Sequence, residues 1–405
     1  MAIKILLITQ VFYPDEVSTA SLFTNLCSEL VKKSVDVEVW CAHPSYTHTE
    51  KQSRKLIFNG INITFLSSTN FKKTFITGRL INYLSFTLSV LLKLLFSKDK
   101  TTVLTHTTPP ALGIILSFIC SIKKRKFIYV LLDIFPEGLI RLGKISRMNI
   151  LVRFWRYMFR LSLRRCDKIV VIGRDMKRWI EGVTGKNISK PEYIPLWHDD
   201  ELIFPLDYTA NELVKEYGLQ EKFVVQYSGN MGLWNDMKVF GSAVRRNPEE
   251  IVFMFVGGGM RMKDLMDSFS MKEQKNVIML PFQPNKEIRK TLTACHAGLV
   301  SLHEGLEGMA VPSKIYGIMA AGIPVIALVP DESEIAYIIR EEGCGIVVNQ
   351  NEKDGLIDAI TLLKSDENAR VLMGRNGRKA FEKKYTAKKV AEKYSMMFNE
   401  LQQLR

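Results

Sequence analysis

Short apolar runs alternate along the chain with longer segments in which apolar residues recur every three or four positions. The first pattern predicts buried strands, and the second predicts amphipathic helices. In the first half of the chain, the expected strands are residues 3–9, 35–41, 61–66, 102–105, 127–132 and 167–172. Strands that alternate with helices in this way predict a parallel sheet with crossover connections.

The same alternation begins again after residues 191–205, where the periodicity is poor. The strands expected there are residues 223–227, 251–256, 277–280, 297–302, 323–328 and 345–348. A chain of 405 residues also exceeds one ordinary hydrophobic core. We therefore expect two doubly wound α/β domains, residues 1–195 and 200–384, with a final helical segment, 385–405, that packs back on the first domain.

The cysteines and the N-terminal residues argue against a zinc site, a disulfide framework and a signal peptide. The six cysteines are scattered without a CxxC pair, so neither a zinc site nor a disulfide framework is expected. Residues 1–8 show neither a basic leader nor a small-residue cleavage site, and we interpret them as the first strand. Because no DxD motif follows a strand, we expect no catalytic metal. We also expect no cofactor.

The charge of the chain is unevenly distributed. The net charge is +14, and residues 1–200 carry 30 Lys and Arg against 15 Asp and Glu. Such asymmetry indicates an anionic partner for one domain, either nucleic acid or an acidic membrane surface. The apolar segments 80–92 and 111–122 favour the membrane, although both are shorter than the roughly 20 residues of a bilayer span. We therefore expect a peripheral or monotopic membrane protein that does not bind nucleic acid.

One segment of the first half, residues 138–166, contains eight basic residues and no acidic residue. Its arginines recur at helical spacing beside aromatic residues, which is typical of a helix that lies in the membrane interface. The alternative is that the aromatic side chains belong to the core and the arginines face solvent. The residues predicted to contact the membrane are Arg153, Arg156, Arg160, Arg164, Trp155 and Phe159.

In doubly wound sheets ligands bind beyond the carboxyl ends of the strands, so the loops after strands are the places to look for chemistry. After the first strand, Tyr13 precedes a helix start at Ser18 and Thr19, where Ser18 can cap the helix and free amides can meet an anion or a hydroxyl group. After residues 127–132, Asp133 and Glu137 flank a proline turn. Asp133 could orient or deprotonate an acceptor hydroxyl, or could simply cap the turn.

Two glycine-rich turns follow strands in the second half of the chain. The first contains Ser228, Gly229 and Asn230, and the second contains Gly257 and Gly258. Glycines let the backbone approach a ligand closely, and two such turns in one domain suggest a phosphorylated ligand. Neither turn matches GxGxxG or a P-loop, and no glycine fingerprint follows the first strand, which argues against an NAD oxidoreductase.

Residues 303–326 read as a glycine-rich loop, a helix that opens with Pro-Ser-Lys, and a strand. Proline suits a first helical turn, whose free amides and dipole attract anions, and Lys314 adds a positive charge. Such donors could stabilise a departing diphosphate, although an ordinary capped helix is the alternative. The donor-binding residues expected in this segment are Met309, Ala310, Val311, Pro312 and Ser313.

A strand that leads into a Tyr-Pro loop, together with residues 227–230, 256–259 and 312–325, resembles family 4 glycosyltransferases over nearly the whole chain. Combined with residues 133–137, these motifs resemble the branch that builds O-antigen, colanic acid and capsule, of the N-acetyl-fucosamine transferase type. The resemblance implies a GT-B fold, in which two Rossmann-like domains face a cleft, and transfer with retention of configuration and without a metal.

The resemblance also implies the substrates and the location. A UDP-sugar donor would be held mainly by the second domain, with uracil at Phe282 and Gln283. The acceptor would be an undecaprenyl-diphosphate-linked saccharide, to which a hexose or an N-acetylamino sugar is added. The protein would therefore act at the cytoplasmic face of the inner membrane, with Asp133 near the acceptor.

The sequence departs from the family pattern at two places. The family has two glutamates, eight positions apart, where this chain has Met309 and Gly317. It also has Arg and Lys after the Ser-Gly turn, where residues 230–232 are Asn-Met-Gly, so Lys314 is expected to supply that charge. Two alternatives stay open: a UDP-sugar epimerase or hydrolase of the same fold, and a non-catalytic assembly partner with a degenerate donor site.

Overall fold

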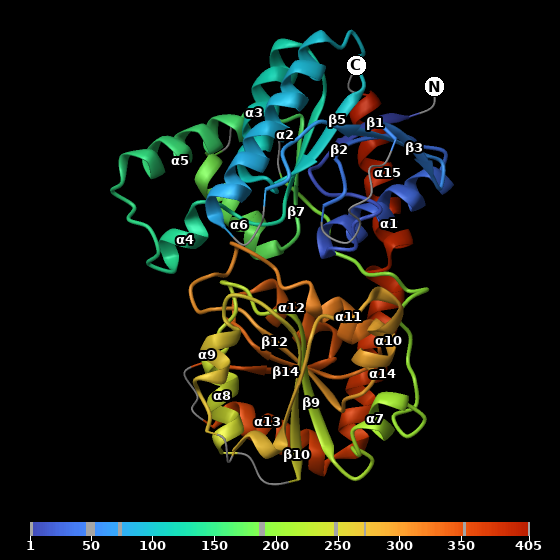
Figure 1. Cartoon of the computed structure of the whole chain (residues 1–405), viewed down its shortest axis with the longest axis vertical. Helices are drawn as coiled ribbons and strands as arrows, with labels where there is room; N and C mark the ends of the chain where they lie inside the picture. Colours follow the sequence, from blue (N-terminus) through green and yellow to red (C-terminus); the bar gives the residue numbers. More distant parts are fainter. Residues whose placement is uncertain are drawn as a thin grey trace. The chain divides into compact units, whose positions relative to one another are not determined.

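The computed structural model describes residues 3–45, 53–71, 75–185, 191–246, 250–270, 273–350 and 354–403. The chain forms two compact units (Figure 1). The first unit comprises Met1–Pro195 together with Ala387–Arg405, and the second comprises Leu196–Thr386. The second unit thus begins four residues before the expected residue 200, and the segment that returns to the first unit begins at Ala387 instead of residue 385.

The first unit is built on a sheet with the strand order β3-β4-β2-β1-β5-β6-β7-β8. Neighbouring strands are parallel except β3 and β4, which pair antiparallel at one edge. The strands are β1 (Lys4–Ile8), β2 (Asp36–Ala42), β3 (Lys55–Phe58), β4 (Ile61–Leu66), β5 (Thr102–His106), β6 (Phe127–Leu131), β7 (Lys168–Val171) and β8 (Glu192–Tyr193). Their central apolar runs are buried on both faces, as parallel strands require.

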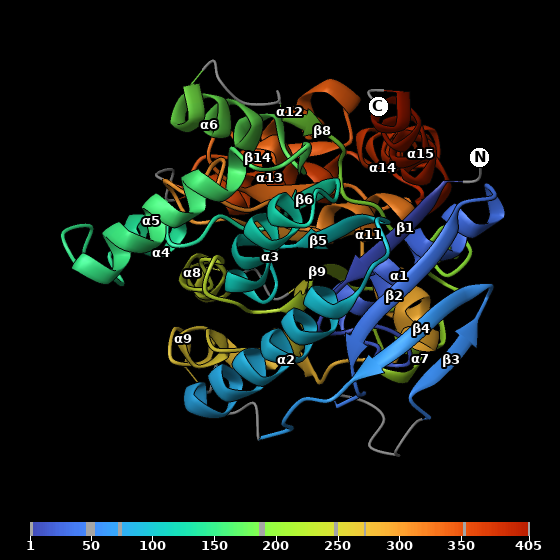
Figure 2. The same cartoon turned by 90° about the horizontal axis from the view of Figure 1, so that it is seen from above.

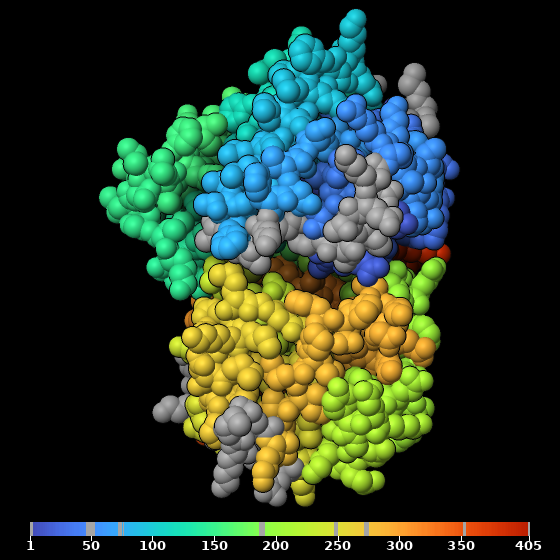
Figure 3. Space-filling view, viewed as in Figure 1, coloured from blue at the N-terminus to red at the C-terminus, as the bar shows by residue number. Residues whose placement is uncertain are grey.

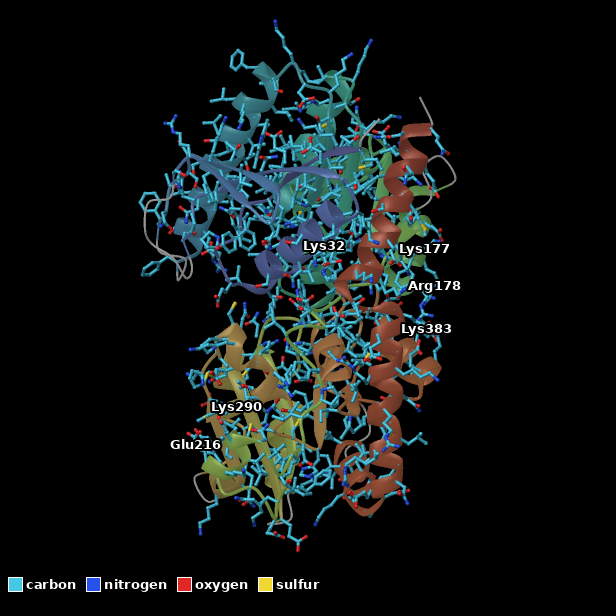
Figure 4. All side chains as sticks on the ribbon, turned by 90° about the vertical axis from the view of Figure 1, so that its right-hand side faces the viewer. Lys32, Lys177, Arg178, Glu216, Lys290 and Lys383 are labelled. Carbon is cyan, nitrogen blue, oxygen red and sulfur yellow. The ribbon has the colours of Figure 1, made fainter. Side chains whose placement is uncertain are left out.

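The helices of this unit are α1 (Ser18–Lys32), α2 (Ile76–Phe96), α3 (Pro110–Ile122), α4 (Glu137–Arg141), α5 (Ile150–Leu163), α6 (Arg174–Thr184) and α15 (Ala387–Gln403). The helix α1 lies on one face of the sheet, and α2, α3 and α5 lie on the other (Figure 2). The last helix, α15, packs along α1 beside the labelled Lys32 (Figure 4), and Lys33 pairs with Glu392 at 3.4 Å.

The second unit has a six-stranded parallel sheet in the order β11-β10-β9-β12-β13-β14. Its strands are β9 (Phe223–Asn230), β10 (Ile251–Gly258), β11 (Val277–Leu280), β12 (Ala297–Ser301), β13 (Val325–Leu328) and β14 (Gly345–Val348). Its helices are α7 (Glu212–Glu216), α8 (Lys238–Arg245), α9 (Met262–Met266), α10 (Ile288–Leu292), α11 (Lys314–Ala320), α12 (Glu334–Glu342), α13 (Gly355–Ser365) and α14 (Glu367–Lys384). Phe240 of α8 packs on Phe255 of β10 in the core.

Candidate active site

Two glycine turns lie side by side at the carboxyl edge of the second sheet. Gly257 is paired with Gly229 where β10 and β9 end, and both have a φ of 120°, a conformation that only glycine adopts easily. A Cβ atom at Gly257 would lie 2.4 Å from the Gly229 carbonyl oxygen. Any larger residue at Gly257 would therefore push the turns apart. Because neither glycine has a side chain, a ligand can approach the backbone at this edge of the sheet.

Lys314, the first residue of α11, brings a positive charge to these turns. Its ammonium donates a hydrogen bond to the Asn230 carbonyl oxygen at 3.0 Å and lies 4.9 Å from the centre of the Tyr227 ring. Burial lowers the pKa of this side chain to about 8. The structure thus brings together the lysine and the glycine turn that the sequence analysis assigned separately to the donor.

The loop before α11 differs from the sequence prediction. The helix begins at Lys314, and Pro312 precedes it by two residues instead of occupying its first turn. The residue before a proline disfavours helical backbone, so the helix cannot extend back to Val311, and Ser313 takes the N-cap position. The side chains of Met309, Ala310 and Val311 are buried, so only their backbone groups could contact a donor. Ser313 is exposed.

Arg261 is a second cation at the same turns, and the sequence analysis missed it. Its backbone N–H donates to the Met231 carbonyl oxygen at 3.0 Å. Its guanidinium contacts His303 Nε2 at 3.3 Å and Asp264 at 2.6 Å, while its buried Nε has no hydrogen-bond partner among the described residues. The only sequence signal is its place just after the second glycine turn.

Asn235, also missed, fixes the loop that follows β9. Its side-chain amide donates to the Ser301 carbonyl oxygen at 2.8 Å and accepts from the Gly232 N–H at 3.1 Å. The His303 N–H donates to the Trp234 carbonyl oxygen at 2.8 Å. The loops after β9 and β12 are therefore tied together, which holds the backbone next to Lys314 in one conformation.

Phe282, predicted to lie at a nucleobase, stands at the edge of this site. Its side chain is 61% exposed, and its ring comes within 3.3 Å of the position that a Gly257 Cβ would take. An exposed flat ring beside two glycine turns is a suitable stacking surface for a base. Gln283 donates its side-chain amide to the Pro281 carbonyl oxygen at 3.0 Å, so its amide is engaged within its own loop.

In the first unit, Asp133 follows β6 at the carboxyl edge of the sheet. The N–H groups of Asp133 and Leu132 both donate to the Thr107 hydroxyl at 3.1 Å. Burial raises the pKa of the Asp133 carboxyl to about 6. A carboxylate of this kind is ionised at neutral pH and basic enough to accept a proton from a hydroxyl group.

His106, at the end of β5, is buried beside this carboxyl edge. Its Nδ1 accepts a hydrogen bond from the Thr108 N–H at 3.2 Å, so the proton is on Nε2, which lies 2.9 Å from the Thr9 hydroxyl. Burial lowers the pKa of His106 to about 3, so the ring is neutral. This neutral ring ties the loops after β1 and β5 together.

Tyr13, Ser18 and Thr19, the residues expected to bind the acceptor, lie at or near the start of α1. The Tyr13 ring stacks on Phe58 at 3.7 Å. Ser18 and Thr19 are the first residues of α1, but the predicted cap is wrong, because Val17 takes the N-cap position in extended backbone and no side chain caps the helix. Ser18 is exposed at that end of the helix.

Three predicted contact residues are corrected by the packing of α5. Glu137 accepts a hydrogen bond from Arg156 at 2.5 Å, and both side chains are largely buried, so this ion pair holds α5 on α4. The structure thus pairs Glu137 and Arg156 with each other, whereas the sequence analysis assigned them to an acceptor and to the membrane. Phe159 is 4% exposed, because it lies on the face of α5 that packs into the unit.

The exposed face of α5 is formed by other residues. Phe154 and Tyr157 are each 63% exposed, and Ile150 and Leu151 extend this apolar surface at the start of the helix. Arg153, Arg160 and Arg164 are exposed as well, and Trp155 is half-buried. The amphipathic character predicted from the sequence is present, with a different set of aromatic residues on the outside.

The described residues contain no group of three His, Cys, Asp or Glu side chains that could hold a metal ion. All six cysteines are buried and unpaired in disulfides. Positive charge at the glycine turns comes from Lys314 and Arg261. Whether the reaction needs a metal stays a prediction of the sequence analysis.

These two parallel-sheet units have the GT-B fold of glycosyltransferases, which confirms the predicted fold class. Residues 210–380, which contain the glycine turns and Lys314, match the family model described as Glycosyl transferases group 1. The probable glycosyltransferase WbjE of Pseudomonas aeruginosa is 29% identical over 248 residues, which cover 60% of this chain and 61% of WbjE. The match thus spans less than two thirds of that relative.

Solved structures share the fold at low sequence identity. The sucrose-phosphate synthase of Thermosynechococcus elongatus superposes with a TM-score of 0.78 at 12% identity, over 100% of both chains. Anabaena HepE in complex with UDP has a TM-score of 0.72 at 13% identity, over 98% of this chain and 100% of HepE.

Proposed function

We propose that the chain is a retaining glycosyltransferase that moves a hexose or an N-acetylamino sugar from a UDP-sugar to an undecaprenyl-diphosphate-linked saccharide. The product would serve O-antigen or capsule biosynthesis. The observation that carries the proposal is the Lys314 ammonium at the Asn230 turn, inside the segment that matches group 1 glycosyl transferases. The probable glycosyltransferase WbjE and the UDP complex of HepE support the reaction class and the donor.

In the donor half, the diphosphate would lie against the turns at Gly229 and Gly257. As the bond between the sugar and the diphosphate breaks, negative charge develops on the phosphate oxygens, and a preorganised cation lowers the energy of that state. Lys314 would supply this cation, and Arg261 would bind the diphosphate from the opposite turn. With these charges in place, we expect no catalytic metal. Phe282 would stack on the uracil ring.

In the acceptor half, Asp133 would bind the hydroxyl group that receives the sugar. Its pKa of about 6 leaves it ionised at pH 7, so it can hold the hydroxyl by a hydrogen bond and take its proton as the new bond forms. Thr107 fixes the backbone of Asp133 and therefore the direction from which the carboxylate reaches the acceptor.

The first unit would bind the cytoplasmic face of the inner membrane. The 20 residues Thr77–Phe96 of α2 are long and apolar enough to cross a bilayer, yet Phe86 and Val90 pack into the unit. Leu80, Leu84 and Leu88 recur every four residues and are each more than half exposed. Residues of α2 lie at the surface that Figure 3 shows. With the basic, aromatic face of α5, this surface suits a peripheral protein on anionic lipid.

The proposal is tested by the transfer of radiolabelled sugar from a panel of UDP-sugars into membrane lipid. Intact protein should label the lipid, whereas Lys314→Ala and Asp133→Asn should not. Lys215→Ala, which removes an exposed lysine of the second unit, is the matched control.

The two alternatives give different results in the same assay. Tight UDP binding without transfer from any donor would favour the non-catalytic assembly partner, for which Met309 and Gly317 in place of glutamates are the main argument. Free sugar or an epimerised UDP-sugar, with no labelled lipid, would favour a hydrolase or epimerase of the same fold.

A further inference from the structure

A polar pocket opens at the carboxyl edge of the first sheet, between the ends of β1, β2 and β4 and the first turns of α2. None of the residues that line it is acidic. It lies on the opposite side of β1 from β6 and Asp133. The polar side chains that matter here are Gln10, His43, Ser68, Asn70, Arg79 and Tyr83.

The wall formed by α2 is held in place by Asn82, which is buried. The Asn82 side chain accepts from the Phe71 N–H at 2.9 Å and donates to the Phe71 carbonyl oxygen at 3.0 Å. The Thr69 hydroxyl also donates to the Asn82 oxygen, at 2.9 Å. The segment after β4 is therefore fixed on α2, so this side of the pocket is formed before any ligand arrives.

Arg79 is the cation of this pocket. It lies on the same face of α2 as Asn82 and Tyr83, three and four residues further along the helix. Within the described ranges, no carboxylate forms an ion pair with it. The other side chains that line the pocket are uncharged, and the nearby Asp15 carboxylate accepts from the Ser45 N–H of the same lining at 3.2 Å. The Arg79 guanidinium is suited to phosphate, because its planar N–H groups match two phosphate oxygens at once.

The position of the pocket decides which part of an acceptor it can bind. In the sheet order, β2 is separated from β6 by β1 and β5, so their ends lie about 14 Å apart at the usual strand spacing. This distance exceeds one sugar ring. A group in the pocket is therefore not the hydroxyl that reacts at Asp133, but a part of the same molecule farther from the reacting end.

The outer side of α2 is apolar. Leu80 and Leu84, on the side of the helix opposite Asn82, are more than half exposed. One helix thus presents a polar, cationic pocket on one side and an apolar surface on the other. A saccharide joined to a lipid through phosphate has the same two kinds of surface at that junction.

We infer that this pocket binds the phosphate linker of the lipid-linked acceptor, with Arg79 as its main ligand and the neighbouring hydroxyl and amide groups on the first sugar. The inference rests on the acceptor class of the proposed function. It assigns Arg79 to acceptor binding and predicts that its removal changes acceptor affinity without changing the donor site.

Calorimetric titration of a short-chain alkyl diphosphate into protein saturated with UDP tests the pocket without relying on transfer. Arg79→Gln should weaken binding about 10- to 100-fold, as expected for the loss of a charge-assisted contact. Arg79→Lys, which keeps the charge but not the fork of donors, should lie in between, and melting temperatures check that each variant folds. Arg54→Gln, an exposed arginine of the same unit, and Lys314→Ala should bind as the intact protein does.

Wild-type affinity of Arg79→Gln for the alkyl diphosphate would overturn the assignment. A loss of this affinity in Lys314→Ala instead would also overturn it, because the alkyl diphosphate would then bind in the second unit. Inorganic pyrophosphate that binds more tightly than the alkyl diphosphate would also overturn it, because the pocket would then be a site for a free anion.

Transfer assays with two matched acceptors test the phosphate contact of Arg79 independently. One acceptor carries the saccharide on an alkyl diphosphate, and the other carries the same saccharide as a neutral alkyl glycoside. Arg79→Gln should raise the KM for the alkyl-diphosphate acceptor about 10- to 100-fold. The kcat, the KM for the neutral glycoside and the KM for the UDP-sugar should not change. An equal rise for both acceptors would contradict the phosphate contact. If intact protein labels neither acceptor, the transferase proposal fails, and the titration still decides the pocket.

Discussion

The Lys314 ammonium and the Asn230 carbonyl oxygen lie 3.0 Å apart, although 84 residues separate them in the chain. The hydrogen bond joins the start of α11 to the end of β9. The partner of the Lys314 ammonium in this bond is a neutral carbonyl group and not a carboxylate. A carbonyl does not neutralise the ammonium, so its charge stays available to a phosphate group.

Replacement of Lys314 should therefore act on the chemical step. We expect Lys314→Met to lower kcat about 100- to 1000-fold, the usual effect of removing a group that stabilises developing negative charge. The donor KM should change much less. Steady-state kinetics with the best UDP-sugar measure both values, and Lys215→Ala serves as the control. A decrease of kcat smaller than threefold would show that Lys314 does not stabilise the leaving group.

The pH profile of kcat/KM should be bell-shaped. Asp133 has a raised pKa of about 6 and acts in its ionised form, so the rate should fall as the pH drops through about 6. Lys314 has a lowered pKa of about 8 and acts in its protonated form, so the rate should fall again as the pH rises through about 8. In Lys314→Arg the alkaline decrease should disappear, because a guanidinium does not titrate in this range. An alkaline decrease that persists in this variant would assign it to another group.

Thr107 should act as a positioning residue for Asp133. In Thr107→Val the N–H groups of Leu132 and Asp133 lose their acceptor, which should lower the free energy of unfolding by about 1–3 kcal/mol. The acidic limb of the pH profile should also move, because the carboxyl group changes its surroundings. Thr107→Ser keeps the hydroxyl and should restore both values. Urea denaturation and the pH profile are the measurements, and an unmoved acidic limb in Thr107→Val would reduce Thr107 to a purely structural role.

Arg261 should contribute to donor affinity. Arg261→Gln should raise the Kd for UDP about 10-fold or more, because a cation beside the diphosphate is lost. Lys263→Gln, which removes an exposed lysine of α9, is the matched control. Titration calorimetry with UDP and with uridine separates the contributions. Equal losses for both ligands would exclude a contact to the diphosphate.

The two faces of α5 should respond differently to substitution. Phe154→Ser combined with Tyr157→Ser should reduce sedimentation with anionic phospholipid vesicles without lowering the melting temperature, because both rings are exposed. Phe159→Ala should instead lower the free energy of unfolding by about 3–5 kcal/mol, because it empties a buried site. Unchanged sedimentation of the double variant would remove α5 from the membrane surface. Neutral vesicles show how much of the binding depends on anionic lipid.

Much of the fold follows from the sequence, because the central strands of a parallel sheet are apolar throughout and easily recognised. The antiparallel edge strand β3 and the two-residue strand β8 were missed, since only one face of β3 is even partly buried and β8 is too short for any pattern. Both depend on their neighbours for hydrogen bonds and carry little signal of their own.

The candidate site was predictable where a motif carries the chemistry, as at Gly229 and Lys314. Arg261 and Thr107 were missed, because each acts through a contact with a loop distant in sequence. Glu137 and Arg156 were assigned to different partners, although they bind one another across 19 residues. Helical spacing indicates which residues share a face of α5, but not which face of the helix is covered.

The return of α15 to the first unit has a consequence for synthesis on the ribosome. Tyr394, Phe398 and Leu401 bury their side chains in a unit that is otherwise made from the first 195 residues. Residues 1–195 are translated before Ala387–Gln403, so the α1 surface stays uncovered until α15 has been translated. The second unit, continuous from Leu196 to Thr386, can fold before the first unit is complete.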